Sequence, residues 1–244
     1  MNAKRLLIAV LTGAGVSTDS GIPDYRGPNG LWQRDPSAQD LVTIGPYLAD
    51  PEVRRRAWLM RRDVGAQAAE PNAAHRALVE LERAGLPVRV LTQNVDGLHQ
   101  AAGQSPRKVL ELHGTARLVE CVRCHRRTDM SAALARVEAG EPDPPCLDCG
   151  AVLKPATVMF GEQLDPVVIS QAEAIASNCD HFIAVGTSLQ VHPAAGLVEV
   201  AVDHGARLTV VNAEPTPYDP LAAELIREPI GTALPALVGR LLTG

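Results

Sequence analysis

Four of the five cysteines form two Cys-x-x-Cys pairs, Cys121 with Cys124 and Cys146 with Cys149. Paired thiolates at this spacing are typical of tetrahedral zinc sites, although the intervening stretch 125–145 is slightly longer than the roughly 15 to 20 residues of many zinc ribbons. Because four thiolates leave no coordination position for water, we predict one structural Zn²⁺ per chain. A redox role for either pair is the alternative, and it is disfavoured because two matched pairs are hard to explain as separate redox centres.

A glycine turn follows the first apolar run of the chain. Residues 12–21 read TGAGVSTDSG and come directly after the apolar residues 6–11. In α/β folds, a turn at this point brings backbone N–H groups and a helix N-terminus close to a pyrophosphate. Only half of the dinucleotide fingerprint is present, because Thr18 replaces the third glycine and no acidic residue follows about 20 residues later. A tight turn without a ligand is an equal alternative for Gly13 and Gly15.

Polar residues follow the apolar run 88–91, in the segment TQNVDGLH (92–99). Gln93, Asn94 and Asp96 would lie at the carboxyl end of a strand, where α/β folds place their ligands. This placement favours a binding site. The alternative is a capped helix start, in which Asn94 or Asp96 accepts backbone N–H bonds.

Two further apolar runs end in small or polar residues. The run 182–185 is followed by GTS (186–188), and the run 208–211 is followed by NAE (212–214). Together with the two ends described above, they predict one contiguous crevice along a sheet edge, sized for a dinucleotide.

A single histidine, His113, lies in the segment LELHG (110–114). A lone histidine is more often structural than catalytic, so residue type alone does not assign it a role. Only the motifs around it favour one.

The elements that would position these residues are short apolar runs alternating with longer helical stretches. The four runs fit strands buried on both faces of a parallel sheet. We therefore predict an α/β fold with a doubly wound, parallel, Rossmann-like sheet. The predicted helices cover residues 51–68, 72–84, 166–176, 193–204 and 234–242.

Two stretches interrupt this alternation. Residues 24–69 contain no convincing strand, and residues 118–153 contain the cysteine pairs with little apolar content. We expect a helical excursion and a zinc-ribbon insertion that together form a small domain. The Rossmann-like domain would then comprise residues 1–23, 70–117 and 154–244.

The net charge of −5 provides no basic surface for direct nucleic-acid binding. No segment approaches the roughly 20 apolar residues of a membrane helix, and residues 6–11 are too few for the roughly 7 to 15 apolar residues of a signal peptide. The cysteine pattern is of the metal-binding kind rather than a disulfide framework. We predict a cytoplasmic monomer without membrane contact, in which the remaining Cys179 is a small buried hydrophobe.

The order of these motifs resembles the sirtuin family, in the form of its bacterial members, over about residues 7–237. The resemblance implies an NAD-dependent protein lysine deacylase that consumes NAD as a co-substrate and acts on acyl-lysine proteins or peptides. Each motif is weak alone, but seven in this order leave little room for coincidence. In chain order they are GAGVSTDSGIPDYRG, TQNVDGLH, ELHG, the paired cysteines, KPATVMFGE, GTSLQVHPAA and VVNAEPT.

The resemblance also implies roles for individual residues, beginning with His113 as the general base. Residues at the pyrophosphate and nicotinamide-ribose region would be Ala14, Gly15, Thr18, Tyr25 and Arg26. The ribose and the nicotinamide pocket would be held by Gln93, Asn94, Val95 and Asp96. The adenosine end would be held by Gly186, Thr187, Ser188, Asn212, Glu214 and Ile230.

The implied reaction begins when bound NAD loses a nicotinamide that has been twisted out of conjugation. The acyl-lysine oxygen then captures the ribose C1′, which gives an alkylimidate. His113, with a pKa near neutrality, would deprotonate a ribose hydroxyl that attacks the imidate. The products would be free lysine, nicotinamide and O-acyl-ADP-ribose.

Residues 158–162 are expected to form a strand, and the substrate peptide is expected to add beside it as a further strand, a recognition mode that uses backbone hydrogen bonds. Val158, Phe160 and Gly161 are the predicted substrate-binding residues of this segment.

The acyl preference depends on two positions of the helical excursion. Sirtuins that remove acidic acyl groups such as succinyl carry a Tyr-x-x-Arg pair, and here Trp58 and Arg61 occupy the matching positions. Arg61 is expected to pair with an acyl carboxylate if it reaches the acyl pocket. The alternative is that Trp58 belongs to the core and Arg61 is solvated.

Two other functions use the same motifs. A protein mono-ADP-ribosyltransferase would pass ADP-ribose from NAD to a protein nucleophile. A non-catalytic NAD-binding or zinc-ribbon interaction module would need neither His113 nor the polar cluster 93–96.

Overall fold

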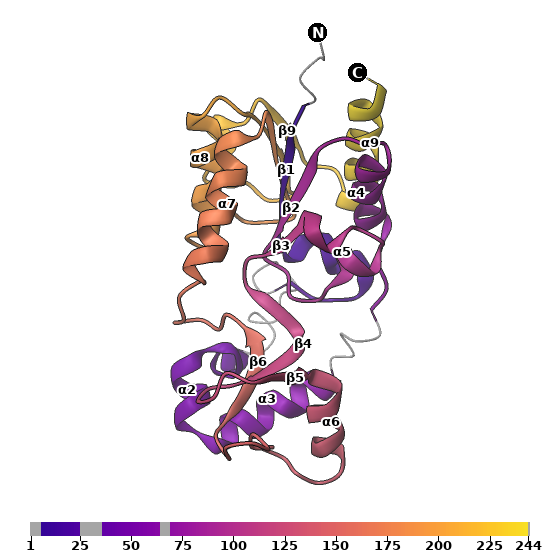
Figure 1. Ribbon diagram of the computed structural model, residues 1–244. Helices are drawn as coiled ribbons and strands as arrows, with labels where there is room; N and C mark the ends of the chain where they lie inside the picture. Colours follow the sequence, from indigo (N-terminus) through magenta and orange to yellow (C-terminus); the bar gives the residue numbers. More distant parts are fainter. Residues whose placement is uncertain (1–5, 25–35, 64–68, 244) are drawn as a thin grey trace.

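The computed structural model describes residues 6–24, 36–63 and 69–243. Its larger part is a six-stranded sheet with the order β3-β2-β1-β7-β8-β9, in which every neighbouring pair is parallel. Helices cover both faces of the sheet, with α7 and α8 on one side and α4 and α9 on the other (Figure 1). This arrangement confirms the predicted fold class. The strands are β1 (Ile8–Thr12), β2 (Val88–Thr92), β3 (Val109–Glu111), β7 (His181–Val185), β8 (Arg207–Val211) and β9 (Glu224–Ile226), and the helices are α4 (Ala73–Arg83), α7 (Pro166–Asn178), α8 (Leu197–Asp203) and α9 (Ile230–Thr243).

The central strands are mostly apolar because successive residues enter two different cores. In β1, Ala9 and Leu11 pack in the core beneath α7 and α8. Ile8 and Val10 pack in the core beneath α4 and α9. Fully burying a side chain of the size of Val10, Leu11 or Ile8 contributes about 1.5 to 3 kcal/mol, which is why both faces of β1 are apolar.

The four predicted strands and the predicted helices are confirmed, with boundaries that shift by a few residues. The helix predicted at 51–68 is α3 (Pro51–Asp63), and residues 64–68 lie outside the described residues. The helix predicted at 193–204 begins with a 3-10 turn, η4 (Ala194–Gly196), before α8. The sequence did not reveal β3 and β9, which are short strands at the two edges of the sheet.

The carboxyl ends of the central strands lie level with one another. Thr12 pairs with Thr92 on one side and with Val185 on the other, and Val185 pairs with Val211. After β1 the chain continues to β2, whereas β7 leads to β8 in the opposite direction across the sheet. The boundary between β1 and β7 is therefore the switch point at which doubly wound sheets bind ligands.

A second, smaller sheet with the antiparallel order β5-β4-β6 continues from the carboxyl edge of the first. It is built from β4 (Gly114–Cys121), β5 (Arg127–Asp129) and β6 (Leu153–Thr157) and is accompanied by α6 (Met130–Glu138). The expectation of little apolar content in this stretch was wrong for α6, which buries four apolar residues at helical spacing. These residues are Met130, Ala133, Leu134 and Val137.

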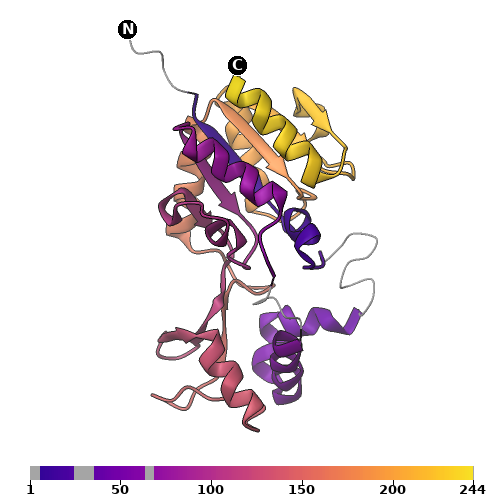
Figure 2. The same cartoon turned by 90° about the vertical axis from the view of Figure 1, so that its right-hand side faces the viewer.

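The helical excursion packs against this small sheet. Its described elements are η2 (Pro36–Val42), α2 (Ile44–Ala49) and α3, and Figures 1 and 2 show α2 and α3 beside β4, β6 and α6. The Tyr47 hydroxyl donates to the Leu153 carbonyl at 2.8 Å, and Arg54 Nε donates to Asp143 Oδ2 at 2.8 Å. The two excursions thus share polar contacts as well as apolar clusters, while the domain boundaries stay a prediction.

Within the part of the chain that the structure describes, no helix is long and apolar enough to cross a membrane.

Candidate functional site

The glycines after β1 allow two loops to approach each other closely. A Cβ atom on Gly13 would lie 2.7 Å from the Gly186 carbonyl oxygen, and one on Gly15 would lie 2.8 Å from the Gly186 Cα. The N–H of Gly13 donates to Val185 O at 3.0 Å, and that of Gly15 donates to Gly186 O at 2.9 Å. Contact between the β1 and β7 loops therefore explains both glycines, and it places the short 3-10 helix η1 (Ala14–Ser20) at the switch point.

The loop after β2, residues 93–96, is called the polar loop below. Asn94 Nδ2 donates to the Gly13 carbonyl at 3.0 Å and to Ser17 Oγ at 3.1 Å. Ser17 Oγ donates to Asp96 Oδ2 at 2.7 Å, while Asp96 Oδ1 accepts the Leu98 N–H at 2.9 Å. Asp96 thus accepts a backbone N–H at the start of α5 (Leu98–Ala101), as in the alternative that we considered, although the N-cap residue is Gly97 and makes no side-chain capping bond. The same carboxylate ties the polar loop to η1.

Gln93 links the two halves of the sheet. Its side-chain Nε2 donates to Thr187 Oγ1 at 3.0 Å, so that the loop after β2 is joined to the loop after β7 across the end of β1. Its backbone N–H donates to the Thr12 carbonyl at 2.9 Å. The polar loop is therefore fixed from three sides.

His113 lies half-buried directly after β3, and its ring is oriented by the backbone of the polar loop. Nδ1 is 3.0 Å from the Gln93 carbonyl oxygen. Because a carbonyl only accepts, Nδ1 must carry the proton, which leaves Nε2 as the unprotonated, basic nitrogen. Burial lowers the pKa of His113 below its usual value, against a smaller opposing effect of the Gln93 carbonyl, so the imidazole is neutral at pH 7.

Gly114 lets the chain turn sharply after His113. It has a φ of +73°, and a Cβ atom there would lie 2.2 Å from the Ala156 carbonyl oxygen. The His113 carbonyl in turn accepts the Val158 N–H at 2.8 Å. The histidine is therefore held where the large sheet, the small sheet and the segment after β6 meet.

The expectation that residues 158–162 form a strand was wrong, because β6 ends at Thr157. The Phe160 N–H donates to Val42 O at 2.9 Å, and Ile44 donates to Phe160 O at 3.0 Å. The segment is thus held by the helical excursion, with one isolated bridge between Phe160 and Thr43. Gly161 follows Phe160 in this segment, has a φ of +89° and turns the chain there.

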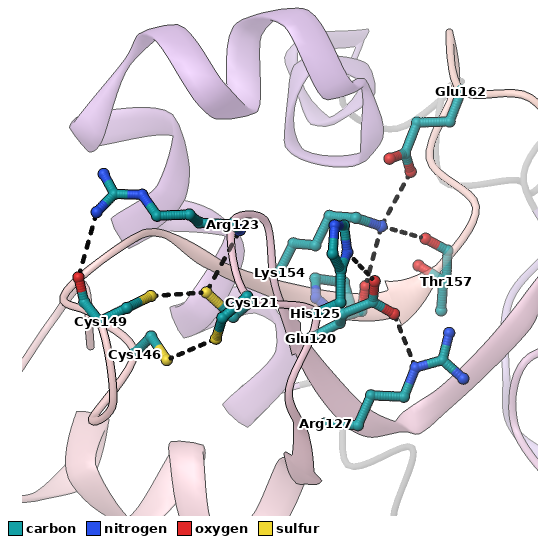
Figure 3. Close-up of polar contacts among 12 residues, drawn as sticks. Glu120, Cys121, Arg123, His125, Arg127, Cys146, Cys149, Lys154, Thr157 and Glu162 are labelled. Carbon is teal, nitrogen blue, oxygen red and sulfur yellow. Dashed lines mark hydrogen bonds and ion pairs between the residues drawn. The ribbon is translucent and has the colours of Figure 1, made fainter.

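An ion pair that the sequence did not single out fixes the same segment. Lys154 Nζ donates to Glu162 Oε2 at 3.0 Å and to the Thr157 carbonyl at 2.8 Å (Figure 3). Glu162 Oε2 also accepts the Met159 N–H at 2.8 Å. Both residues lie in the motif KPATVMFGE, but only the fold brings the two charges together.

Four cysteines beside the small sheet converge on one point, and Figure 3 labels three of them, Cys121, Cys146 and Cys149. Their sulfur atoms lie within 4.8 Å of one another, with 3.4 Å between Cys121 and Cys149 and 3.7 Å between Cys124 and Cys146. Tetrahedral zinc with Zn–S bonds of about 2.3 Å places its sulfurs about 3.8 Å apart, whereas a disulfide bond measures about 2.05 Å. The cluster fits one zinc ion. An Arg123 N–H donates to Cys121 Sγ at 3.4 Å, a contact that would orient the thiolate.

Trp58 is fully buried and packs with Val119 and Met130 in the core of the small sheet. This placement agrees with the alternative that Trp58 is a core residue. Arg61 is half-buried, and its Nη1 donates to the Ala57 carbonyl at 2.8 Å. Burial raises the pKa of nearby Tyr47 to about 12, and the positive charge of Arg61 partly opposes this rise.

The remaining predicted residues lie around the same edge, except Tyr25 and Arg26, which are outside the described residues. Asn212 Nδ2 donates to the Glu214 carbonyl at 2.8 Å, which shapes the loop after β8. Ala14 is the first residue of η1, Thr18 Oγ1 donates to the Gly15 carbonyl at 3.0 Å, and the Val95 carbonyl accepts the Ala116 N–H at 2.9 Å.

Two predicted residues lie toward the other end of the edge. Ser188 follows Thr187, the residue that Gln93 contacts, and Ile230 is the first residue of α9.

Comparison with known proteins identifies close relatives. The sequence profile of the Sir2 family matches residues 13–193. The NAD-dependent protein deacetylase 2 of Streptomyces coelicolor is 73% identical over 232 residues, which are 95% of this chain and 96% of that protein. The NAD-dependent protein deacetylase of Haloarcula marismortui is 44% identical over 234 residues, 95% of this chain and 88% of that protein.

Solved structures are similar over nearly the whole chain. A Sir2 variant with a deacetylated p53 peptide and 3'-O-acetyl-ADP-ribose has a TM-score of 0.88 at 35% identity, covering 97% of this chain and 94% of the other. A Sir2 protein bound to a propionylated peptide has a TM-score of 0.85 at 33% identity, with the same coverage.

Removal of one predicted zinc ligand should unfold the small sheet. For Cys121→Ala we expect zinc content well below one per chain and a lower melting temperature, because structural zinc contributes directly to folding energy. Metal analysis and thermal unfolding measure both. Cys179→Ala, at a buried cysteine outside the cluster, is the matched control and should keep one zinc per chain. A metal-free preparation with wild-type unfolding and activity would contradict this assignment.

Proposed function

The chain belongs to the Sir2 family and is an NAD-dependent protein deacylase, and we propose that His113 is the general base of its reaction. The observation that supports this role most directly is the 3.0 Å contact between His113 Nδ1 and the Gln93 carbonyl. It fixes the tautomer in which Nε2 can take a proton. The depressed pKa keeps that nitrogen unprotonated at neutral pH.

NAD is consumed as a co-substrate, and when bound it supplies a ribose carbon that exchanges nicotinamide for the acyl oxygen. We propose that the polar loop holds the nicotinamide-ribose part. Its groups suit this task, since Asp96 is a carboxylate of the kind that binds ribose hydroxyls, and Asn94 is held over η1 by Gly13 and Ser17. Asp96 uses one lone pair of each oxygen within the protein, and each oxygen retains another.

The other ends of NAD are assigned by position along the same sheet edge. The pyrophosphate would lie against Ala14, Gly15 and Thr18, together with Tyr25 and Arg26. The adenosine end would lie at the loops after β7 and β8, held by Gly186, Thr187, Ser188, Asn212, Glu214 and Ile230.

His113 Nε2 would accept the proton of a ribose hydroxyl, while Nδ1 keeps its hydrogen bond to the Gln93 carbonyl. The orientation of the ring therefore stays the same during the proton transfer. The substrate protein or peptide would bind beside Val158, Phe160 and Gly161, a segment outside the strands whose position the Lys154–Glu162 ion pair helps to fix.

We propose that the acyl groups removed are neutral ones. Trp58 is buried and offers no phenol toward an acyl chain, and Arg61 donates to the backbone of its own helix. We also propose a monomer in the cytoplasm that contacts neither nucleic acid nor membrane directly. The net charge of −5 supports the lack of nucleic-acid contact, and the metal-type cysteine pattern supports the cytoplasmic location.

Replacement of the proposed base should remove turnover but not binding. We expect His113→Ala to lower deacylation by at least about 100-fold, the scale of a lost general base, while NAD still binds. Mass spectrometry of the products from acetyl-lysine peptide and NAD measures turnover and identifies O-acyl-ADP-ribose. His204→Ala, at an exposed histidine, is the control. Near-normal turnover of His113→Ala would rule out the role, and ADP-ribosylated protein as the main product would contradict deacylation.

The acyl preference is tested by two neighbouring arginines. We expect Arg61→Met to leave the ratio of succinyl-lysine to acetyl-lysine turnover unchanged, because its guanidinium serves the helix rather than an acyl carboxylate. The exposed Arg62→Met, whose partner is Asp63, is the matched control. A selective loss of succinyl turnover, by about 10-fold or more as expected for a charge-assisted bond, would show that Arg61 reads acidic acyl groups.

A further inference from the structure

Four buried polar side chains lie directly beneath the polar loop. Thr12 Oγ1 donates to Thr92 Oγ1 at 2.9 Å and lies 3.0 Å from His99 Nε2. Thr92 Oγ1 also accepts the N–H of Asn94 at 3.0 Å. The ring of His75 meets that of His99 edge to face, with 4.9 Å between ring centroids. None of these side chains has a role in the chemistry proposed above.

The hydrogen bonds define which nitrogen of each ring carries the proton. Thr12 gives its only hydroxyl proton to Thr92, so His99 must donate from Nε2 and must leave Nδ1 unprotonated. The Asn72 N–H donates to His75 Nδ1 at 3.3 Å, so His75 carries its proton on Nε2. Burial lowers the pKa of His75 to about 4 and that of His99 to about 3, which keeps both rings neutral.

The two ring nitrogens left over differ in character. His75 Nε2 is a donor and His99 Nδ1 is an acceptor, and both are buried without a hydrogen-bond partner among the described residues. If Thr92 donated to Thr12 and Thr12 donated to His99 instead, His99 Nδ1 would carry a proton and would be a second buried donor. The two histidines are therefore joined by ring contact alone.

We propose that His99, with His75, is a positioning residue for NAD, connected to the polar loop by a chain of hydrogen bonds through Thr12 and Thr92. At one end of the chain, Thr92 Oγ1 accepts a hydrogen bond from the Asn94 N–H. This inference rests on the proposed role of the polar loop.

The ring contact between His99 and His75 extends this buried cluster toward η1. Asn72, which caps α4 together with His75, donates from Nδ2 to the Val16 carbonyl at 2.8 Å and to Ser20 Oγ at 3.0 Å. The buried cluster thus contacts both the polar loop and η1, the two segments that are proposed to hold the nicotinamide-ribose and pyrophosphate parts of NAD. Apolar residues would fill the same volume, but they could not fix the Asn94 N–H.

The first experiment uses Thr12→Val, which keeps the shape and removes the hydroxyl. We expect its KM for NAD to rise by about 10-fold, the size of one lost buried hydrogen bond, with the KM for acetyl-lysine peptide changed by less than about two-fold. Thr12→Ser, which restores the hydroxyl, should return the KM for NAD to within about three-fold of wild type. A purely structural role would move the melting temperature alone, and unchanged KM for NAD in Thr12→Val would overturn the proposal.

The second experiment needs no variant. Nitrogen-15 NMR of the histidine side chains in the wild-type protein should show His75 and His99 both neutral and both protonated at Nε2. A proton on His99 Nδ1 would overturn the chain of donors. The proposed function has a separate test. A wild-type protein that releases no nicotinamide from NAD in the presence of an acyl peptide would contradict it, whichever tautomers the histidines adopt.

Discussion

The site depends on the close approach of the loops after β1 and β7. Side chains at Gly13 or Gly15 would collide with the backbone of Gly186, which itself has a φ of +60°. Because these three positions lack side chains, η1 can begin directly over the switch point, within reach of the polar loop. The glycines are thus required by protein packing before any nucleotide binds. A ligand at this edge would bind to a surface whose shape is set by the strand order and by the contact between the two loops.

Gln93 connects binding to chemistry through three of its groups. Its N–H continues the pairing of β2 with β1, its side chain joins the β7 loop, and its carbonyl holds His113 Nδ1. A displacement of the polar loop would therefore also rotate the proposed base. This explains physically why a sheet edge, two loops and one histidine from different parts of the chain would function as a unit.

The sequence predicted the features that depend on local pattern. Strands such as β7 are apolar because both faces are buried, and the cysteine pairs have a spacing that few other sites share. It did not predict β3 and β9, since strands of three residues leave no periodicity to detect. The run 158–162 looked like a strand, but its N–H groups pair with His113 and Val42 rather than with a strand.

Long-range partners were beyond sequence reasoning for a similar physical reason. The hydroxyl of Ser17 binds a carboxylate 79 positions away, and Lys154 meets Glu162 only because the chain turns after β6. Trp58 matched a family position, yet the phase of α3 places its indole in the core. Such outcomes are fixed by packing and topology, which the residue types alone do not encode.

The most direct test of the account is the pH dependence of kcat/KM for acetyl-lysine peptide at saturating NAD. Burial lowers the pKa of His113, so the basic form persists at lower pH than for a free histidine, and activity is lost only as the pH falls through that depressed value. We expect the acid limb of the profile to have its midpoint below about pH 6.5, the ordinary pKa of histidine. An acid limb centred above 7, or one that persists unchanged in His113→Ala, would contradict it.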